Sequence, residues 1–127
     1  MTVAPRERPV RVVVIDDSID LRGLLCLALS RAGLDVVGEA GDGSAGIDVV
    51  REQRPDLVLL DLSMPVMDGI EALPLLRALA PDARIIVFSG YDAALTRQTL
   101  ALGADGHVVK GTPLKEIVAY VEASIAG

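Results

Sequence analysis

Aromatic side chains are almost missing from this sequence of 127 residues, which has no tryptophan and contains only Phe88, Tyr91 and Tyr120. Because 51% of the residues are nonetheless hydrophobic, the core has to be built from valine, leucine, isoleucine and alanine. Cysteine is also scarce, and Cys26 alone can form neither an internal disulfide nor a cysteine cluster for zinc. The sequence therefore predicts an aliphatic core without covalent or zinc cross-links.

Long apolar runs and excess positive charge are missing as well. No run approaches the length of a membrane span, and the start of the chain lacks the apolar stretch of a signal peptide. The net charge of −6 argues against direct binding of nucleic acid or of an anionic membrane by this chain. We therefore expect one small cytoplasmic domain over residues 10–127, preceded by a flexible arm over residues 1–9.

Short apolar runs alternate with longer helix-forming segments along the chain. The expected strands cover Val10–Ile15, Leu34–Ala40, Asp56–Leu60, Arg84–Phe88 and Gly106–Val109. The expected helices run from a Ser18 cap to Ala32, from Ser44 to just before Pro55, from an Asp68 cap, over Ala93–Leu102, and from a Thr112 cap with Pro113 in the first helical position. This alternation predicts an α/β fold, a doubly wound five-stranded parallel sheet with helices on both faces.

Polar side chains follow four of these strands at their carboxyl ends. Asp16 and Asp17 follow the first strand, Asp61 the third, Ser89 the fourth and Lys110 the fifth. In an open parallel sheet, this edge is where binding sites form. Carboxylates bind a hard divalent cation, and an ammonium and a hydroxyl group can hold an anion. The edge therefore predicts a site that moves a phosphoryl group onto an aspartate.

Four short motifs occur in order at these strand ends. They are Asp16-Asp17, Asp61 with Met64-Pro65 and Met67-Asp68-Gly69, Ser89-Gly90, and the segment from Gly103 to Lys110. Through them the chain resembles, from about Val10 to Ile125, a response-regulator receiver domain of two-component signalling. The resemblance implies a flavodoxin-like sheet of strand order 2-1-3-4-5. It also implies that the chain is not an enzyme in its own right but a phosphoacceptor that assists its own phosphotransfer and dephosphorylation.

The resemblance assigns a metal site to the acidic residues. Asp61 is expected to be the phosphoacceptor and, with Asp17, a direct ligand of Mg²⁺. The backbone carbonyl of Ser63 is expected to complete the protein ligands, and Asp16 to act through a metal-bound water. This arrangement suits magnesium, which keeps several of its waters and takes few protein ligands.

The resemblance also assigns roles around the phosphoryl group. Lys110 is expected to pair with Asp61 and then with the phosphoryl oxygens, and Ser89 to donate a hydrogen bond to them. His107 lies at the position of the family's aromatic switch residue, so Ser89 and His107 are the expected switch pair. Ser63 and Tyr91 occupy the positions that tune hydrolysis of the phosphoaspartate. The bulky ring of Tyr91 is expected to hinder the approach of water.

The implied phosphoryl donor is a phosphohistidine on a sensor histidine kinase or on a histidine phosphotransfer protein. One departure from the family lies directly after Lys110, where Gly111 replaces a proline that often has a cis peptide bond. The segment from Lys110 to Glu116 resembles receivers that precede a LuxR-type helix-turn-helix module. Both a single-domain regulator and a receiver cut from a longer DNA-binding protein remain open.

Other interpretations of the same residues compete with this one. Asp16 and Asp17 would also suit a helix N-terminus, Ser89 a turn, Lys110 a solvated strand end and His107 an exposed edge strand. The main functional alternative is a degenerate receiver that acts as a phosphorylation-independent interaction domain. A haloacid dehalogenase phosphatase would need an acid where Ser63 stands. A flavin-binding carrier would need a Ser/Thr/Gly phosphate loop after the first strand.

Two helical segments carry more apolar residues than one buried face needs. Leu24–Leu29 are six apolar residues in a row, and Ile117–Val121 repeat the pattern in the last helix. At 3.6 residues per turn, such runs go round the helix and leave some apolar side chains facing water. We expect a shared exposed surface that docks the histidine-containing donor or a second copy of the chain, forming a homodimer through the first and last helices. The alternative is that helix tilt and long neighbouring side chains cover it.

Overall fold

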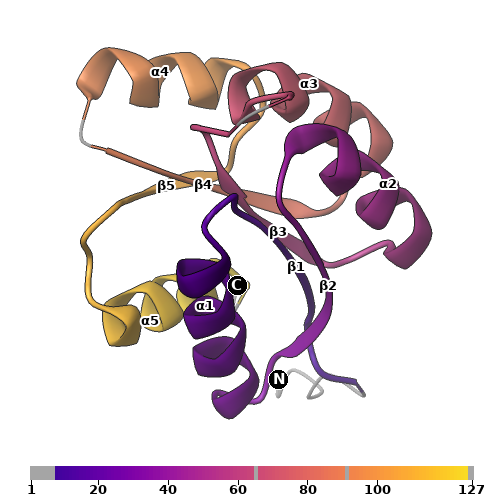
Figure 1. Ribbon diagram of the computed structural model, residues 1–127, viewed down its shortest axis with the longest axis vertical. Helices are drawn as coiled ribbons and strands as arrows, with labels where there is room; N and C mark the ends of the chain where they lie inside the picture. The colour runs from indigo at the N-terminus through magenta and orange to yellow at the C-terminus, as the bar shows by residue number, and fades with distance from the viewer. Residues whose placement is uncertain (1–7, 65, 91, 126–127) are drawn as a thin grey trace, which may run out of the picture.

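The computed structural model describes residues 8–64, 66–90 and 92–125. It contains one five-stranded parallel sheet of order β2-β1-β3-β4-β5, which confirms the predicted fold class and strand order (Figure 1). The strands are β1 (Arg11–Ile15), β2 (Asp35–Ala40), β3 (Leu57–Asp61), β4 (Arg84–Ser89) and β5 (Gly106–Val109). Asp61 and Ser89 are thus the last residues of their strands, one position beyond the predicted strand ends.

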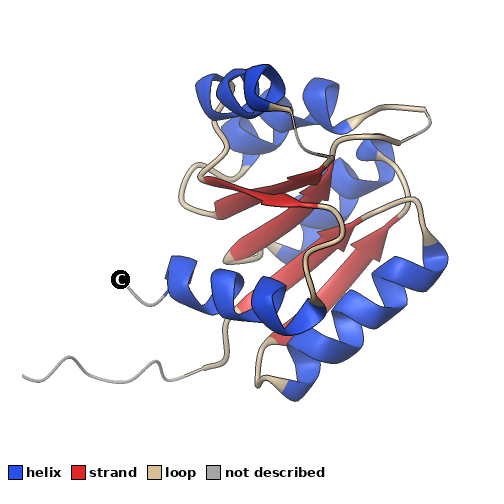
Figure 2. Cartoon of the chain, turned by 90° about the vertical axis from the view of Figure 1, so that its left-hand side faces the viewer, coloured by secondary structure: helices blue, strands red, loops and turns tan. Residues whose placement is uncertain are grey.

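Five helices cover the two faces of this sheet. One face carries α1 (Ile19–Arg31) and α5 (Leu114–Ile125), and the other carries α2 (Gly43–Gln53), α3 (Gly69–Leu79) and α4 (Ala93–Ala101) (Figures 1 and 2). Within the described residues, no helix has the length and apolar character needed to cross a membrane. Of the predicted N-terminal arm, only residues 8 and 9 are described, and Arg8 forms an ion pair with Asp56 at 2.8 Å.

The alternation of side chains along each strand separates the core into two aliphatic layers. Val12 and Val14 of β1 pack under α1 and α5, whereas Val13 and Ile15 pack under α2 and α3. All five residues of β3 are buried, as expected for the central strand of a sheet covered on both faces. The sheet is therefore packed against helices on both faces, which fixes the positions of the residues at its carboxyl edge.

Helix starts follow the available hydrogen-bond acceptors. Ser18 and Asp68 cap α1 and α3 as predicted, through bonds from Leu21 and Glu71 amides. The predicted start of α2 at Ser44 is wrong, because the Asp42 carboxylate accepts from the Ala45 amide at 2.8 Å and the helix begins at Gly43.

The last helix also differs from its predicted start. It begins at Leu114, one residue after Pro113. The Thr112 hydroxyl donates to the Val109 carbonyl at 2.7 Å and thereby closes the turn after β5.

One arginine joins several segments at the edge of the sheet opposite the predicted site. Arg77 near the end of α3 is only about a quarter exposed. Its guanidinium donates to the carbonyls of Ala83 at 2.8 Å, Gly103 at 2.9 Å, Pro81 at 3.1 Å and Ala80 at 3.3 Å, and to the Asp105 carboxylate at 2.6 Å. Asp105 in turn accepts from the Ile85 amide at 2.8 Å. This network ties α3 to the segments that lead into β4 and β5.

The loop from β3 to α3 contains a strained residue. Val66 has φ of 66°, in the left-handed region that β-branched residues avoid, and its side chain is 84% exposed. Asparagine tolerates this conformation much better. We therefore expect Val66→Asn to raise the free energy of unfolding by about 1 kcal/mol, measured by urea denaturation. Val66→Ala, which keeps a Cβ without the polar group, should gain less, and an equal or larger gain from alanine would contradict this explanation.

Candidate functional site

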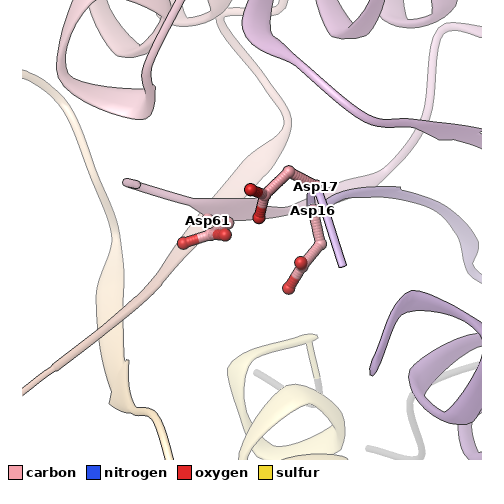
Figure 3. A group of neighbouring side chains, drawn as sticks. All are labelled: Asp16, Asp17 and Asp61. Carbon is pink, nitrogen blue, oxygen red and sulfur yellow. The ribbon is translucent and has the colours of Figure 1, made fainter. Parts of the chain in front are cut away.

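Three carboxylates meet where β1 and β3 end. Asp16 and Asp17 follow β1, Asp61 ends β3, and one carboxylate oxygen of each lies within 4.8 Å of the other two (Figure 3). Asp16 and Asp61 are buried, whereas Asp17 is exposed. The parallel pairing of β1 with β3 brings together residues that lie 45 positions apart in the sequence. The structure thus assembles the predicted acidic cluster.

Backbone amides fix the orientation of the two buried carboxylates. The Ser18 amide donates to Asp16 Oδ1 at 2.8 Å, and the Ser63 amide donates to Asp61 Oδ1 at 3.1 Å. Both are side-chain bonds to the backbone two residues ahead, a local turn that Asp favours. The other oxygens, Asp16 Oδ2 and Asp61 Oδ2, are buried and have no hydrogen-bond partner among the described residues. Buried polar atoms are rarely left in this state, so these oxygens are suited to hold a further group.

Burial of Asp16 and Asp61 side by side makes their negative charges unfavourable when no cation is bound. Burial raises the pKa of Asp61, and the nearby Asp16 charge adds to this, while hydrogen bonds from Lys110 and Ser63 lower it. Burial also raises the pKa of Asp16. A hard divalent cation accepts carboxylate oxygens and would offset the repulsion among them. Asp16, Asp17 and Asp61 therefore fit a site for Mg²⁺, and the exposed Asp17 marks the side open to solvent.

Lys110 reaches the acidic cluster from β5. Its Nζ lies 2.9 Å from Asp61 Oδ1, and its amide donates to the Ser89 carbonyl at 2.7 Å. Gly111 follows with φ of 95°, which the fixed ring of proline cannot adopt. Proline could not adopt the turn seen here, and the Lys110 ammonium meets the aspartate with glycine at this position.

Ser89 and His107 are in direct contact. Ser89 Oγ lies 2.7 Å from His107 Nε2, and the serine is buried at the end of β4. His107 is half-buried on β5, so it is not the simple exposed edge residue of the alternative interpretation. The structure therefore joins the two residues of the predicted switch pair, while Tyr91 lies outside the described residues.

The start of α3 packs tightly against the strand that carries Asp61. A Cβ at Gly69 would overlap the Asp61 carbonyl oxygen and the Leu62 backbone, and the Gly69 amide donates to the Leu62 carbonyl at 3.1 Å. Only glycine permits this approach. The carboxyl end of β3 and the first turn of α3 are thereby held together.

Sequence reasoning missed one residue that supports the site. Arg22, on the first turns of α1, donates from Nη1 to the Asp16 carbonyl at 2.6 Å and from Nε to Glu39 on β2 at 3.1 Å. The available signal was an arginine about one helical turn after the acidic pair, on the face that returns to β1. Its bond to the backbone could not be inferred from that spacing.

Comparison with known proteins connects this site to one family. The family model for the response regulator receiver domain matches residues 12–122. The virulence-factor transcription regulator BvgA of Bordetella pertussis is 35% identical over 118 residues, which cover 92% of this chain and 56% of BvgA. The chain spans about half or less of the full length of the curated relatives it matches.

Solved structures are similar to this chain as well. The receiver domain of the response regulator NarL from Mycobacterium tuberculosis has a TM-score of 0.84 and 38% identity, over 92% of this chain and 97% of that one. A chain of the CheX–CheY–BeF3–Mg complex from Borrelia burgdorferi has a TM-score of 0.87 and 27% identity, over 91% of this chain and 89% of that one.

Proposed function

Because this chain belongs to the response regulator receiver domain family of two-component systems, we propose that Asp61 accepts a phosphoryl group with Mg²⁺ bound beside it. The observation that carries the proposal is the surroundings of Asp61. One oxygen meets the Lys110 ammonium at 2.9 Å, and the other is buried without a partner among the described residues, beside two further carboxylates. We further propose that the donor is a phosphohistidine of a sensor histidine kinase or a phosphotransfer protein, met in the cytoplasm.

The transfer would form a bond between an Asp61 carboxylate oxygen and phosphorus while the bond from phosphorus to the donor nitrogen breaks. A carboxylate is a poor nucleophile towards an anion unless charge is offset. Lys110 places an ammonium against Asp61 for this purpose, and Ser89 carries a hydroxyl at the adjacent strand end. Bound Mg²⁺, held by Asp16, Asp17, Asp61 and the Ser63 carbonyl, would supply the remaining neutralisation.

The test is intact-mass spectrometry of the whole chain after incubation with acetyl phosphate. With Mg²⁺ we expect a mass gain of one phosphoryl group, and with excess EDTA we expect none. A degenerate receiver would stay unmodified under both conditions, and that result would overturn the proposal. A mass gain that does not depend on Mg²⁺ would overturn the role of the metal.

Solvent-exposed leucines on α1 favour a protein partner at this helix. The run Leu24–Leu29 goes round the helix as predicted, since Leu25 and Leu29 are buried while Leu24 and Leu27 are 51% and 49% exposed. On the neighbouring α5, Ile117 and Val121 are buried and the exposed Tyr120 lies over Gly106 of the edge strand β5, so the exposed apolar surface is mainly on α1. We propose that this surface docks the phosphohistidine donor or a second copy of the chain.

Leu24→Glu is expected to slow phosphotransfer from the cognate donor, or to weaken self-association, by roughly tenfold, because it places a charge in an apolar contact. Labelling by acetyl phosphate should be unchanged, since the acidic cluster lies at the strand ends. Leu75→Glu on α3 is the matched control, with a leucine 50% exposed on the other face. If Leu24→Glu reduces labelling by both donors equally and leaves self-association unchanged, this surface is not a docking site.

A further inference from the structure

A series of polar contacts leads away from the proposed phosphorylation site through His107. Ser89 Oγ lies 2.7 Å from His107 Nε2, and His107 Nδ1 lies 3.5 Å from Thr96 Oγ1. The Thr96 hydroxyl also bonds the Asp92 carbonyl at 3.0 Å. The contacts thus connect β4, β5 and the first turn of α4, where Asp92 is the cap.

The donors and acceptors in this series of contacts can be assigned by starting from the Asp92 carbonyl. The Asp92 carbonyl can only accept, so the Thr96 hydroxyl donates its single proton there. Thr96 Oγ1 is then an acceptor for His107 Nδ1–H, which leaves Nε2 of the neutral ring as an acceptor. Ser89 therefore donates to Nε2 at 2.7 Å, in preference to the Gly90 carbonyl at 3.1 Å.

This assignment conflicts with the role proposed for Ser89. A serine hydroxyl has one proton, and Ser89 cannot donate it to His107 and to a phosphoryl oxygen on Asp61 at once. If Nε2 carries a proton instead, the imidazole donates to Ser89 and the serine proton is free. The protonation of one nitrogen then decides where the hydroxyl points.

We propose that His107 and Thr96 are positioning residues, which direct the Ser89 hydroxyl away from Asp61 while His107 is neutral and release it to the phosphoryl group once Nε2 is protonated. This proposal rests on the proposed function, because it concerns the same phosphoryl group. It makes occupation of Asp61 by a phosphoryl group and protonation of His107 mutually favourable.

No charged residue among the described neighbours of His107 is a cause of its pKa shift. The charged residues on β4, β5 and α4, or next to their ends in the sequence, are Arg84, Asp92, Arg97, Asp105 and Lys110. Burial lowers the pKa of His107, and none of these residues is among the causes. A phosphoryl anion bonded to Ser89 would act in the opposite direction and raise this pKa.

The first test uses the fact that His107 is the only histidine in the chain. Long-range proton–nitrogen NMR spectra of the nitrogen-15-labelled chain identify the tautomer and the pKa of its ring without ambiguity. In the free protein we expect the tautomer with the proton on Nδ1. A dominant Nε2–H tautomer in the free protein would overturn the proposal, and this measurement needs no phosphoryl chemistry.

The second test repeats the titration with Mg²⁺ and beryllofluoride, which mimics a phosphoryl group on Asp61. The pKa of His107 is expected to be higher in the complex than in the free protein, whereas an equal or lower pKa would overturn the proposal. Failure of beryllofluoride to bind would instead count against the proposed function, so the two failures can be told apart.

Variants give an independent readout. Each unit of difference in pKa makes beryllofluoride bind about tenfold more tightly to the protonated form, so wild-type affinity should rise with falling pH relative to His107→Gln. Thr96→Val should shift the free ring towards the Nε2–H tautomer. Thr99→Val is the matched control, because Thr99 donates to the Thr96 carbonyl at 2.9 Å through its own hydroxyl. Equal pH profiles for the wild type and His107→Gln, or equal effects of the two threonine variants on the tautomer, would contradict the proposed relay.

Discussion

Asp61→Asn is expected to reduce labelling by acetyl phosphate at least about 10³-fold, the scale seen when a nucleophile is removed. The amide is neutral and cannot form the acyl phosphate, although it keeps the size and position of the side chain. Asp16 and Asp17 remain in the variant, but they are not expected to replace Asp61 as the acceptor, because Lys110 is paired with Asp61 in the structure. The measurement is the intact mass of the variant after incubation with donor and Mg²⁺.

Asp48→Asn serves as the control for this substitution. Asp48 is an exposed carboxylate on α2 that pairs with Arg51 and lies outside the acidic cluster. It should be labelled at the wild-type rate. Labelling of Asp61→Asn at that same rate would show that another residue is the acceptor.

The same substitution should change stability in a pH-dependent manner. Because the pKa of Asp61 is raised, the folded state holds a proton more tightly than the unfolded state does above the ordinary value of 3.8. The contribution of Asp61 to the stability of the metal-free protein therefore falls as the pH rises from 3.8 through the raised pKa. In urea denaturation with EDTA, Asp61→Asn should thus gain stability relative to the wild type as the pH rises above 3.8, and Mg²⁺ should reduce that gain.

Arg77→Ala is expected to lower the free energy of unfolding by about 3 kcal/mol, and the melting temperature by roughly 10 °C. The substitution leaves the Ala83, Gly103 and Pro81 carbonyls without the guanidinium that binds them, and it removes the ion pair that Arg77 forms with Asp105 at 2.6 Å. Because the side chain is mostly buried, water replaces these bonds only in part. Urea denaturation and thermal melting both report the loss.

Two further variants isolate the cause. Arg51→Ala removes an exposed ion pair with Asp48 and should cost no more than about 0.5 kcal/mol. Arg77→Lys should recover only part of the loss, since one ammonium group cannot reproduce the planar fork of donors. Equal losses from Arg51→Ala and Arg77→Ala would refute the role assigned to this network.

The sequence was sufficient to predict the fold and the acidic cluster because both depend on local patterns combined with one rule of topology. Asp16, Asp61, Ser89 and Lys110 each lie at or just after the carboxyl end of a strand, so a parallel sheet places them at one edge. The strand ends themselves were misplaced by one residue at Asp61 and Ser89, because hydrogen bonding to the neighbouring strand, and not residue type, decides where a strand stops.

The remaining contacts could not be predicted because they join side chains to distant groups. The bond of Arg22 to the Asp16 carbonyl depends on how α1 packs against β1. The contact of Ser89 with His107 depends on the register of β4 and β5, and that of Thr96 on the position of α4 above them. The Asp42 cap was missed for a local reason, since Ser44 and Asp42 are both good caps and only the backbone conformation distinguishes them.

The contact of Gly69 with the Asp61 carbonyl makes the α3 side of the site more tightly packed than the β4 side. On the α3 side, the acceptor strand and the first turn of the helix leave no space for even a methyl group at Gly69. On the β4 side, the Ser89 hydroxyl contacts the half-buried His107 imidazole, and both side chains can rotate about single bonds. When a phosphoryl group binds to Asp61, the side chains that respond are therefore expected to be those of β5 and α4, through Ser89, and not those of β3 and α3. A partner that distinguishes the two states of the chain is then expected to contact that side of the molecule.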